Sequence, residues 1–261
     1  MRGPHRSCDH GAVRPTAQHD LSSTWCDIPA RASRAALGRP QEHPRDAGGS
    51  FPGPGTVDAS TLLVYIMDVY DPWSYAYLPS VSAVLSAACS LVDVEIVQSG
   101  HDTSGRPDAF AATVDAVSRS TDACFGAEFL AALRSGSLVV DAEAAAAGVI
   151  ALLATEQMPV STVIGAVQHE FFVCGRPLES PGVLGRVATN LGLDAQAIEL
   201  FAASARAHEL AAEDFAVARD LNVGGRPLLL ASRGDRLFEF DGLGASSQRL
   251  VDQFRTVLTR P

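Results

Sequence analysis

The hydrophobic and polar positions of the chain change character at about residue 58. The run Thr61–Met67 is apolar and rich in β-propensity, long enough for a buried strand and too short for a helix. Apolar residues then recur at helical spacing from Trp73 to Ala88, and the alternating segment Val92–Val97 predicts a second strand. The first elements are therefore predicted to be a strand, a helix and a strand.

From about residue 107 to 220 the pattern is almost wholly helical. Amphipathic stretches occupy Ala109–Arg119, Glu128–Arg134, Asp141–Ala154, Ser161–Phe172, Gly182–Asn190 and Asp194–Arg219. Two short β-rich segments follow at hairpin spacing, Leu228–Ala231 and Arg236–Phe240, and Ser247–Leu258 predicts a final helix. This order predicts the α/β class, as a thioredoxin fold with a large all-helical insertion.

The same pattern sets the expected domain limits. Residues 58–106 and 221–261 are expected to form the thioredoxin-fold domain, and residues 107–220 the helical insert domain. Residues 1–57 are rich in proline and histidine and have almost no apolar periodicity. Such a segment buries too little surface to offset its chain entropy, so we predict a disordered N-terminal extension.

Composition narrows the functional classes. The 261 residues are 47% hydrophobic and carry a net charge of -10, which disfavours a nucleic-acid surface. Five scattered cysteines without a C-x-x-C motif are typical of a reduced intracellular protein. No signal peptide is recognisable, and the apolar run Ala144–Ala154 is too short to cross a bilayer. We expect a cytoplasmic protein without membrane or metal binding.

Candidate chemistry is concentrated where the first helix begins. Asp71 stands at the predicted N-cap and Pro72 at the first helical position, in the segment Asp68-Val-Tyr-Asp71-Pro72-Trp73-Ser74-Tyr75. A carboxylate there accepts hydrogen bonds from backbone N–H groups. The segment predicts a negatively charged helix start.

Three motifs in order then resemble the DsbA-like family, over about residues 60 to 258. The first is Asp68-x-x-Asp71-Pro72-Trp73-Ser74-Tyr75. The second is Ala166-Val-Gln168-His169-Glu170-Phe171-Phe172-x-x-Gly175-Arg176, followed by Val187 to Asp194. The third is Ala218-Arg219-x-Leu221-x-Val223-x-Gly225-x-Pro227. The resemblance is strongest to the FrnE-like branch, which includes predicted dithiol-disulfide isomerases. The first motif is also similar to that of kappa-class glutathione transferases and hydroxychromene carboxylate isomerases.

The resemblance implies that Asp71 and Ser74 occupy the positions of the family's two redox cysteines. Oxygen side chains form no disulfide, so dithiol exchange at this position is excluded. We expect the helix start to lower the pKa of Asp71 and keep it ionised. Asp71 is then either a helix cap or a base and cation anchor, with Ser74 as a hydrogen-bond donor.

The resemblance also implies a cis Pro227 opposite the helix start. Arg226, which precedes it, either pairs with Asp71 or holds an anionic substrate. Trp73 and Tyr75 either line the ligand groove or pack between the helix and the insert. Weaker candidates are His101, Asp102 and His169, for which a structural or solvated role is favoured.

Three functions follow. The favoured one is a protein that has lost thiol-disulfide activity and binds a peptide, protein or small molecule in the groove, without a cofactor. The alternative is a non-redox isomerase or thiol transferase that uses Asp71, Ser74 and a low-molecular-weight thiol. The third is redox chemistry through a lone thiol, Cys124 or Cys174. A homodimer is compatible with each.

Overall fold

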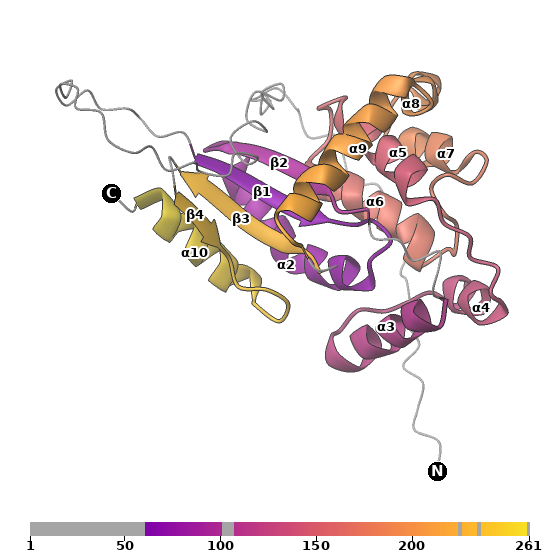
Figure 1. Cartoon of the computed structure of the whole chain (residues 1–261), viewed down its shortest axis with the longest axis horizontal. Coiled ribbons are helices and arrows are strands. Elements are labelled where there is room, and N and C mark those ends of the chain that lie inside the picture. The colour runs from indigo at the N-terminus through magenta and orange to yellow at the C-terminus, as the bar shows by residue number, and fades with distance from the viewer. Residues whose placement is uncertain (1–60, 101–106, 224–225, 234–235, 260–261) are drawn as a thin grey trace, which may run out of the picture.

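A computed structural model describes residues 61–100, 107–223, 226–233 and 236–259 of the chain (Figure 1). The predicted disordered extension, residues 1–57, lies outside the described residues, as do His101 and Asp102. In chain order the elements are β1 (Thr61–Met67), α2 (Pro72–Ala88), β2 (Asp93–Gln98), α3 (Pro107–Ser120), α4 (Ala127–Ser135), α5 (Ala142–Leu153), α6 (Val160–Phe172), α7 (Val183–Asn190), α8 (Ala195–Ala202), α9 (Ala205–Asp220), β3 (Leu228–Arg233), β4 (Arg236–Glu239) and α10 (Ser247–Thr259).

The strands form one mixed sheet in the order β2-β1-β3-β4. β1 pairs in parallel with β2 and antiparallel with β3, and β4 adds to β3 as an antiparallel edge. The predicted strand at Thr61–Met67 is confirmed to the residue, and its burial explains its continuous apolar sequence. The α/β thioredoxin fold predicted from the sequence is therefore confirmed.

Helices cover both faces of the sheet (Figure 1). Alternate strand residues such as Tyr65 and Leu229 belong to the main core, together with apolar residues of α2 and α10. The intervening residues, such as Val64 and Leu230, form a second core with the C-terminal part of α9. The period of two along each strand thus separates the two layers of packing.

Helices α3 to α9 separate β2 from β3 along the chain, where the helical insert was predicted. α9 packs both on β2 and on α5, so it connects the sheet to the other helices. The exact limits of the two predicted domains stay a prediction. No helix within the described ranges is both long enough and apolar enough to traverse a lipid bilayer.

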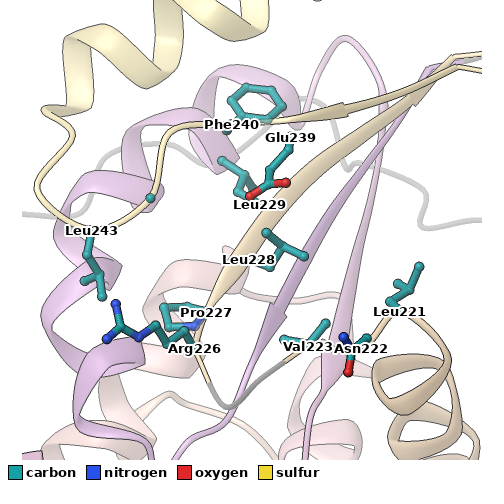
Figure 2. A pocket seen from close by; sticks show the side chains of 11 residues that line it. Leu221, Asn222, Val223, Arg226, Pro227, Leu228, Leu229, Glu239, Phe240 and Leu243 are labelled. Atoms are coloured by element: carbon teal, nitrogen blue, oxygen red, sulfur yellow. The ribbon is translucent and has the colours of Figure 1, made fainter.

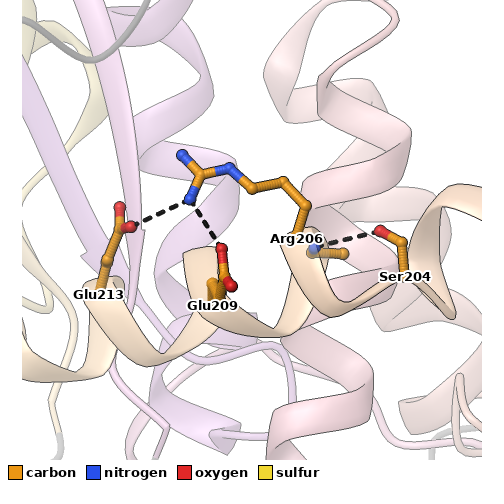
Figure 3. Close-up of polar contacts among 5 residues, drawn as sticks. Ser204, Arg206, Glu209 and Glu213 are labelled. Atoms are coloured by element: carbon orange, nitrogen blue, oxygen red, sulfur yellow. Dashed lines mark hydrogen bonds and ion pairs between the residues drawn. The ribbon is translucent and has the colours of Figure 1, made fainter.

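One predicted helix is wrong in its extent. The stretch Asp194–Arg219 was predicted as continuous, but it breaks between α8 and α9. Ser204 has extended backbone angles, and its hydroxyl accepts a hydrogen bond from the N–H of Ala207, so it caps a new helix (Figure 3). Behind this cap Arg206 lies 3.0 Å from Glu209 and 3.4 Å from Glu213, contacts that support the first turns of α9.

Candidate functional site at the start of α2

Asp71 is the N-cap of α2, as the sequence predicts. Its backbone is extended, with φ -82° and ψ 120°, and Pro72 follows at the first helical position. One carboxylate oxygen accepts a hydrogen bond from the Trp73 N–H at 3.2 Å, and the other accepts one from the Ser74 N–H at 2.7 Å. The carboxylate therefore satisfies two backbone donors that the helix itself leaves open.

Ser74 completes this cap instead of facing the solvent. Its hydroxyl donates to the carboxylate of Asp71 at 2.9 Å and accepts a hydrogen bond from the Asp68 N–H at 3.3 Å. Only 5% of Asp71 and 1% of Ser74 is exposed. Asp71 and Ser74 thus form a closed, buried hydrogen-bonded unit.

The expected lowering of the Asp71 pKa is wrong. The pKa of Asp71 is raised to about 6, mainly by burial and to a smaller extent by the nearby Asp68 carboxylate, while the hydrogen bonds from Ser74 and Trp73 lower it. The helix start supplies the stabilising N–H donors that we expected, but removing the carboxylate from water outweighs them. Asp71 therefore titrates close to neutral pH.

A buried tyrosine lies on the sheet side of this unit. Tyr65 of β1 is fully buried, and its hydroxyl has no hydrogen-bond partner in the described structure. Burial raises the pKa of Tyr65, and the charge of Asp71 raises it further. The environment of Asp71 is therefore apolar and poor in charge-stabilising groups on this side.

Arg226 does not pair with Asp71 in the structure. Its guanidinium carbon lies 5.2 Å from the centroid of the Trp73 ring, a cation–π contact, and its side chain is exposed. Asp71 lies buried within the cap, with its oxygens engaged by Trp73 and Ser74. The ion pair between Arg226 and Asp71 that the sequence analysis considered therefore does not form.

The cis geometry expected for Pro227 is also wrong. The described residues contain no cis peptide bond, so the bond between Arg226 and Pro227 is trans. The trans isomer is intrinsically favoured before proline by about 0.5–1 kcal/mol. Pro227 is buried, and Leu228 directly after it pairs with Ile66 of β1.

A pocket of about 530 Å³ opens beside Pro227 (Figure 2). It is lined by Leu221, Asn222, Val223, Arg226, Pro227, Leu228, Leu229, Glu239, Phe240, Gly242 and Leu243. Arg226 and Pro227 line this cavity, and their role in binding a ligand stays a prediction. Asp71, Ser74, Trp73 and Tyr75 are not among its lining residues, although Trp73 reaches the pocket through its contact with Arg226.

Tyr75 packs between α2 and the helical region. Its ring stacks on Phe172 of α6 with centroids 4.7 Å apart, and its hydroxyl donates to the carbonyl oxygen of Cys124 at 2.9 Å. This is the packing role considered from the sequence. The ring anchors the start of α2 against α6.

Sequence reasoning missed a second anchor, at Tyr70. The Tyr70 hydroxyl forms a short hydrogen bond with the Glu179 carboxylate and accepts one from the Leu178 N–H at 2.6 Å. The other oxygen of Glu179 accepts from the N–H of Asp141, the N-cap of α5. Tyr70 and Glu179 are 109 positions apart, and no local pattern signals their contact.

The remaining candidates do not contribute to the hydrogen bonds of the Asp71–Ser74 cap. His169 is exposed on α6. Cys89 caps the opposite end of α2, and no disulfide joins Cys89, Cys124 and Cys174. No cluster of His, Cys, Asp and Glu suited to a metal ion occurs in the described part of the chain.

Comparison with solved structures supports the fold. A candidate protein disulfide isomerase from Nitrosomonas europaea superimposes with a TM-score of 0.66 at 21% identity, covering 76% of this chain and 98% of its own. The cytosolic disulfide reductase DsbM from Pseudomonas aeruginosa gives 0.60 at 24% identity, covering 76% and 96%. A second DsbM structure, with glutathione, gives 0.59 at 24% identity, covering the same shares.

Comparison at the level of sequence gives the family. No curated protein matches the chain. The family model described as DSBA-like thioredoxin domain matches residues 62–254, which span β1 to α10. The chain therefore belongs to the DSBA-like thioredoxin domain family.

Proposed function

We propose that this protein is a redox-inactive member of its family that binds a partner in the pocket beside Pro227. The observation that carries the proposal is the closed cap of Asp71 and Ser74 at the positions of the redox cysteines. Thiol-disulfide exchange needs an attacking thiolate and a second thiol that resolves the mixed disulfide. Neither group is present at the start of α2.

The other described thiols do not supply this pair. Cys89 lies at the far end of α2, a helix of 17 residues, which is about 25 Å long at 1.5 Å per residue. Cys124 lies between α3 and α4, where its carbonyl oxygen accepts the Tyr75 hydroxyl, and Cys174 follows the end of α6; no disulfide links them. A pocket beside Pro227 is the feature suited to binding, since its volume falls within the range of about 300–1,000 Å³ typical of ligand sites.

Insulin reduction and reactivation of scrambled ribonuclease test the redox part. We expect no turnover by the wild-type protein. The double variant Asp71→Cys/Ser74→Cys restores a Cys-Pro-Trp-Cys sequence at the helix start and should gain activity, whereas each single variant should not. Turnover by the wild type comparable to that of the double variant would overturn the proposal.

Binding is tested with a model extended peptide, the alkylated and fluorescein-labelled B chain of insulin. Leu243→Arg places a long charged side chain at the pocket and should weaken binding, measured by fluorescence anisotropy. Leu237→Arg is the matched control, because Leu237 is exposed on β4 and does not line the pocket. Equal weakening by both variants would count against the pocket as the binding surface.

A second candidate function is non-redox catalysis with a low-molecular-weight thiol. It is favoured by the pKa of Asp71, about 6, which suits a general acid or base near neutral pH. DsbM has a similar fold and was solved with glutathione, so glutathione is the first ligand to test. Thermal stabilisation by glutathione that disappears in Asp71→Ala would support this function; no stabilisation would reject it.

A further inference from the structure

Arg226 presents an unneutralised positive charge at the pocket. Its side chain is exposed and lines the cavity, and its guanidinium makes a cation–π contact with the Trp73 ring. No carboxylate within the described ranges pairs with it. Arg249, by contrast, pairs with Asp241, and Arg176 pairs with Glu170.

The contact with Trp73 orients the Arg226 guanidinium without neutralising its positive charge. An aromatic face attracts a guanidinium through its quadrupole but leaves most of the five N–H donors open. A guanidinium matches a carboxylate through two parallel N–H···O bonds. Arg226 is therefore preorganised to receive a carboxylate.

Part of the pocket lining is apolar. Leu228, Leu229, Phe240 and Leu243 contribute hydrocarbon surface to the lining (Figure 2). Glu239 lies apart from Arg226 in the same view, across the leucines. An anionic group is therefore attracted to the Arg226 side and repelled from the Glu239 side, which gives a bound acid a defined orientation.

From these contacts we propose that the pocket binds a small-molecule carboxylic acid with an apolar body, and that Arg226 is the residue that selects the acid. The carboxylate contacts the guanidinium held over Trp73, and the apolar body lies on Leu228, Leu229 and Phe240. This inference rests on the proposed function, since it names the ligand class of the same pocket.

Trp73 serves as the reporter for the test. The chain has two tryptophans, Trp25 and Trp73, so Trp25→Phe leaves Trp73 as the sole indole. In this background the Trp73 fluorescence is titrated with 4-phenylbutyrate and with its neutral amide, 4-phenylbutyramide. We expect saturable binding of the acid and about tenfold weaker binding of the amide, since a hydrogen bond to a charged partner contributes more than a neutral one.

Variants at Arg226 test whether this residue causes the preference for the acid over the amide. Arg226→Gln should remove the preference for the acid, and Arg226→Lys should keep part of it because the charge remains. Arg134→Gln is the matched control, an exposed arginine on α4 outside the pocket, and should change nothing. The Trp73 emission maximum and urea unfolding confirm that each variant is folded.

The inference is overturned if acid and amide bind equally, if neither binds, or if the preference survives in Arg226→Gln. Tighter binding of an amidated neutral peptide than of 4-phenylbutyrate would overturn the small-acid assignment while leaving the pocket as the binding surface. Insulin reduction tests the proposed loss of redox function separately. A failure of the small-acid proposal can therefore be distinguished from a failure of the redox proposal.

Discussion

The hydroxyl of Ser74 donates a 2.9 Å hydrogen bond to the carboxylate of Asp71, at the two positions that the resemblance assigns to the cysteines of redox members. In redox members the second position supplies a resolving thiol. Here it supplies a hydrogen bond that stabilises a buried charge. Under the proposed function, a capping pair stands at the helix start where redox members carry a reactive pair.

The first prediction concerns Asp71 and pH. Its pKa in the folded protein is about 6, above the value of 3.8 for an unfolded chain. The folded state therefore binds the proton more tightly, so this contribution to stability is complete below pH 3.8 and is lost as the pH rises through 6. A difference of this size corresponds to roughly 3 kcal/mol.

Urea unfolding of the wild type and Asp71→Asn between pH 4 and pH 8 measures it. The variant lacks the titrating group, so its stability relative to the wild type should increase by up to about 3 kcal/mol over this range. Asp194→Asn, at the exposed cap of α8, should not reproduce this relative gain. A constant difference between Asp71→Asn and wild type across the range would contradict the raised pKa.

The second prediction concerns Ser74. Both its N–H and its hydroxyl bind the Asp71 carboxylate and lower its pKa, against the larger effect of burial. Ser74→Ala keeps the N–H and removes the hydroxyl, so the pKa of Asp71 should rise further, and stability at neutral pH should fall by about 1–3 kcal/mol. The carboxyl carbon of Asp71, followed by NMR over pH, reports the first change directly. Ser82→Ala serves as the control, because that hydroxyl bonds to the Leu78 carbonyl farther along the helix.

How far the sequence predicts this site depends on how local each interaction is. The cap at Asp71 and the proline after it were predictable, because an N-cap uses donors two and three residues ahead. The direction of the Asp71 pKa was not, since it depends on how deeply α2 is buried against the sheet and α6. The apolar periodicity continues through Ser204, so the sequence pattern alone predicts α8 and α9 as one helix. The structure breaks the helix there because Ser204 caps the start of α9.

The strand β1 and the contacts of Arg226 also differ in how well the sequence predicts them. Thr61–Met67 is recognisable because it is buried on both faces and uniformly apolar. The stacking of Arg226 on Trp73 joins distant segments, for which the spacing of residues carries no signal. The family resemblance placed these residues near one another but did not fix their geometry.

The third prediction concerns the contact between Tyr70 and Glu179. Tyr70 is buried and joins the end of β1 to the segment before α7 through Glu179 and the Leu178 N–H. Tyr70→Phe keeps the ring on Phe171 but removes both hydrogen bonds, so it should destabilise the protein by about 1–3 kcal/mol.

A double-mutant cycle with Glu179→Gln isolates the pair, and we expect a coupling free energy of about 1 kcal/mol or more. Tyr75→Phe provides the comparison, because its hydroxyl bond to the Cys124 carbonyl lies in an exposed setting and should contribute less. Additive effects of the two substitutions at Tyr70 and Glu179 would show that this hydrogen bond does not tie the two regions together.

The last prediction concerns the close approach of two backbones at Gly126. This residue caps α4, and its N–H donates to the Phe172 carbonyl at 2.9 Å. A Cβ atom at Gly126 would lie 1.9 Å from the carbonyl oxygen of Val173, an atom of the backbone that cannot rotate away. The backbone angles of Gly126, φ -70° and ψ 155°, suit any residue, so the obstacle is space alone.

Gly126→Ala should therefore separate the start of α4 from the end of α6 and reduce the free energy of unfolding by about 3 kcal/mol. Gly242→Ala is the matched control, since a Cβ there meets no atom within 4 Å, and it should change stability by less than about 0.5 kcal/mol. If both variants unfold at the same urea concentration as the wild type, the segments at Gly126 and Val173 are not in the close contact described above.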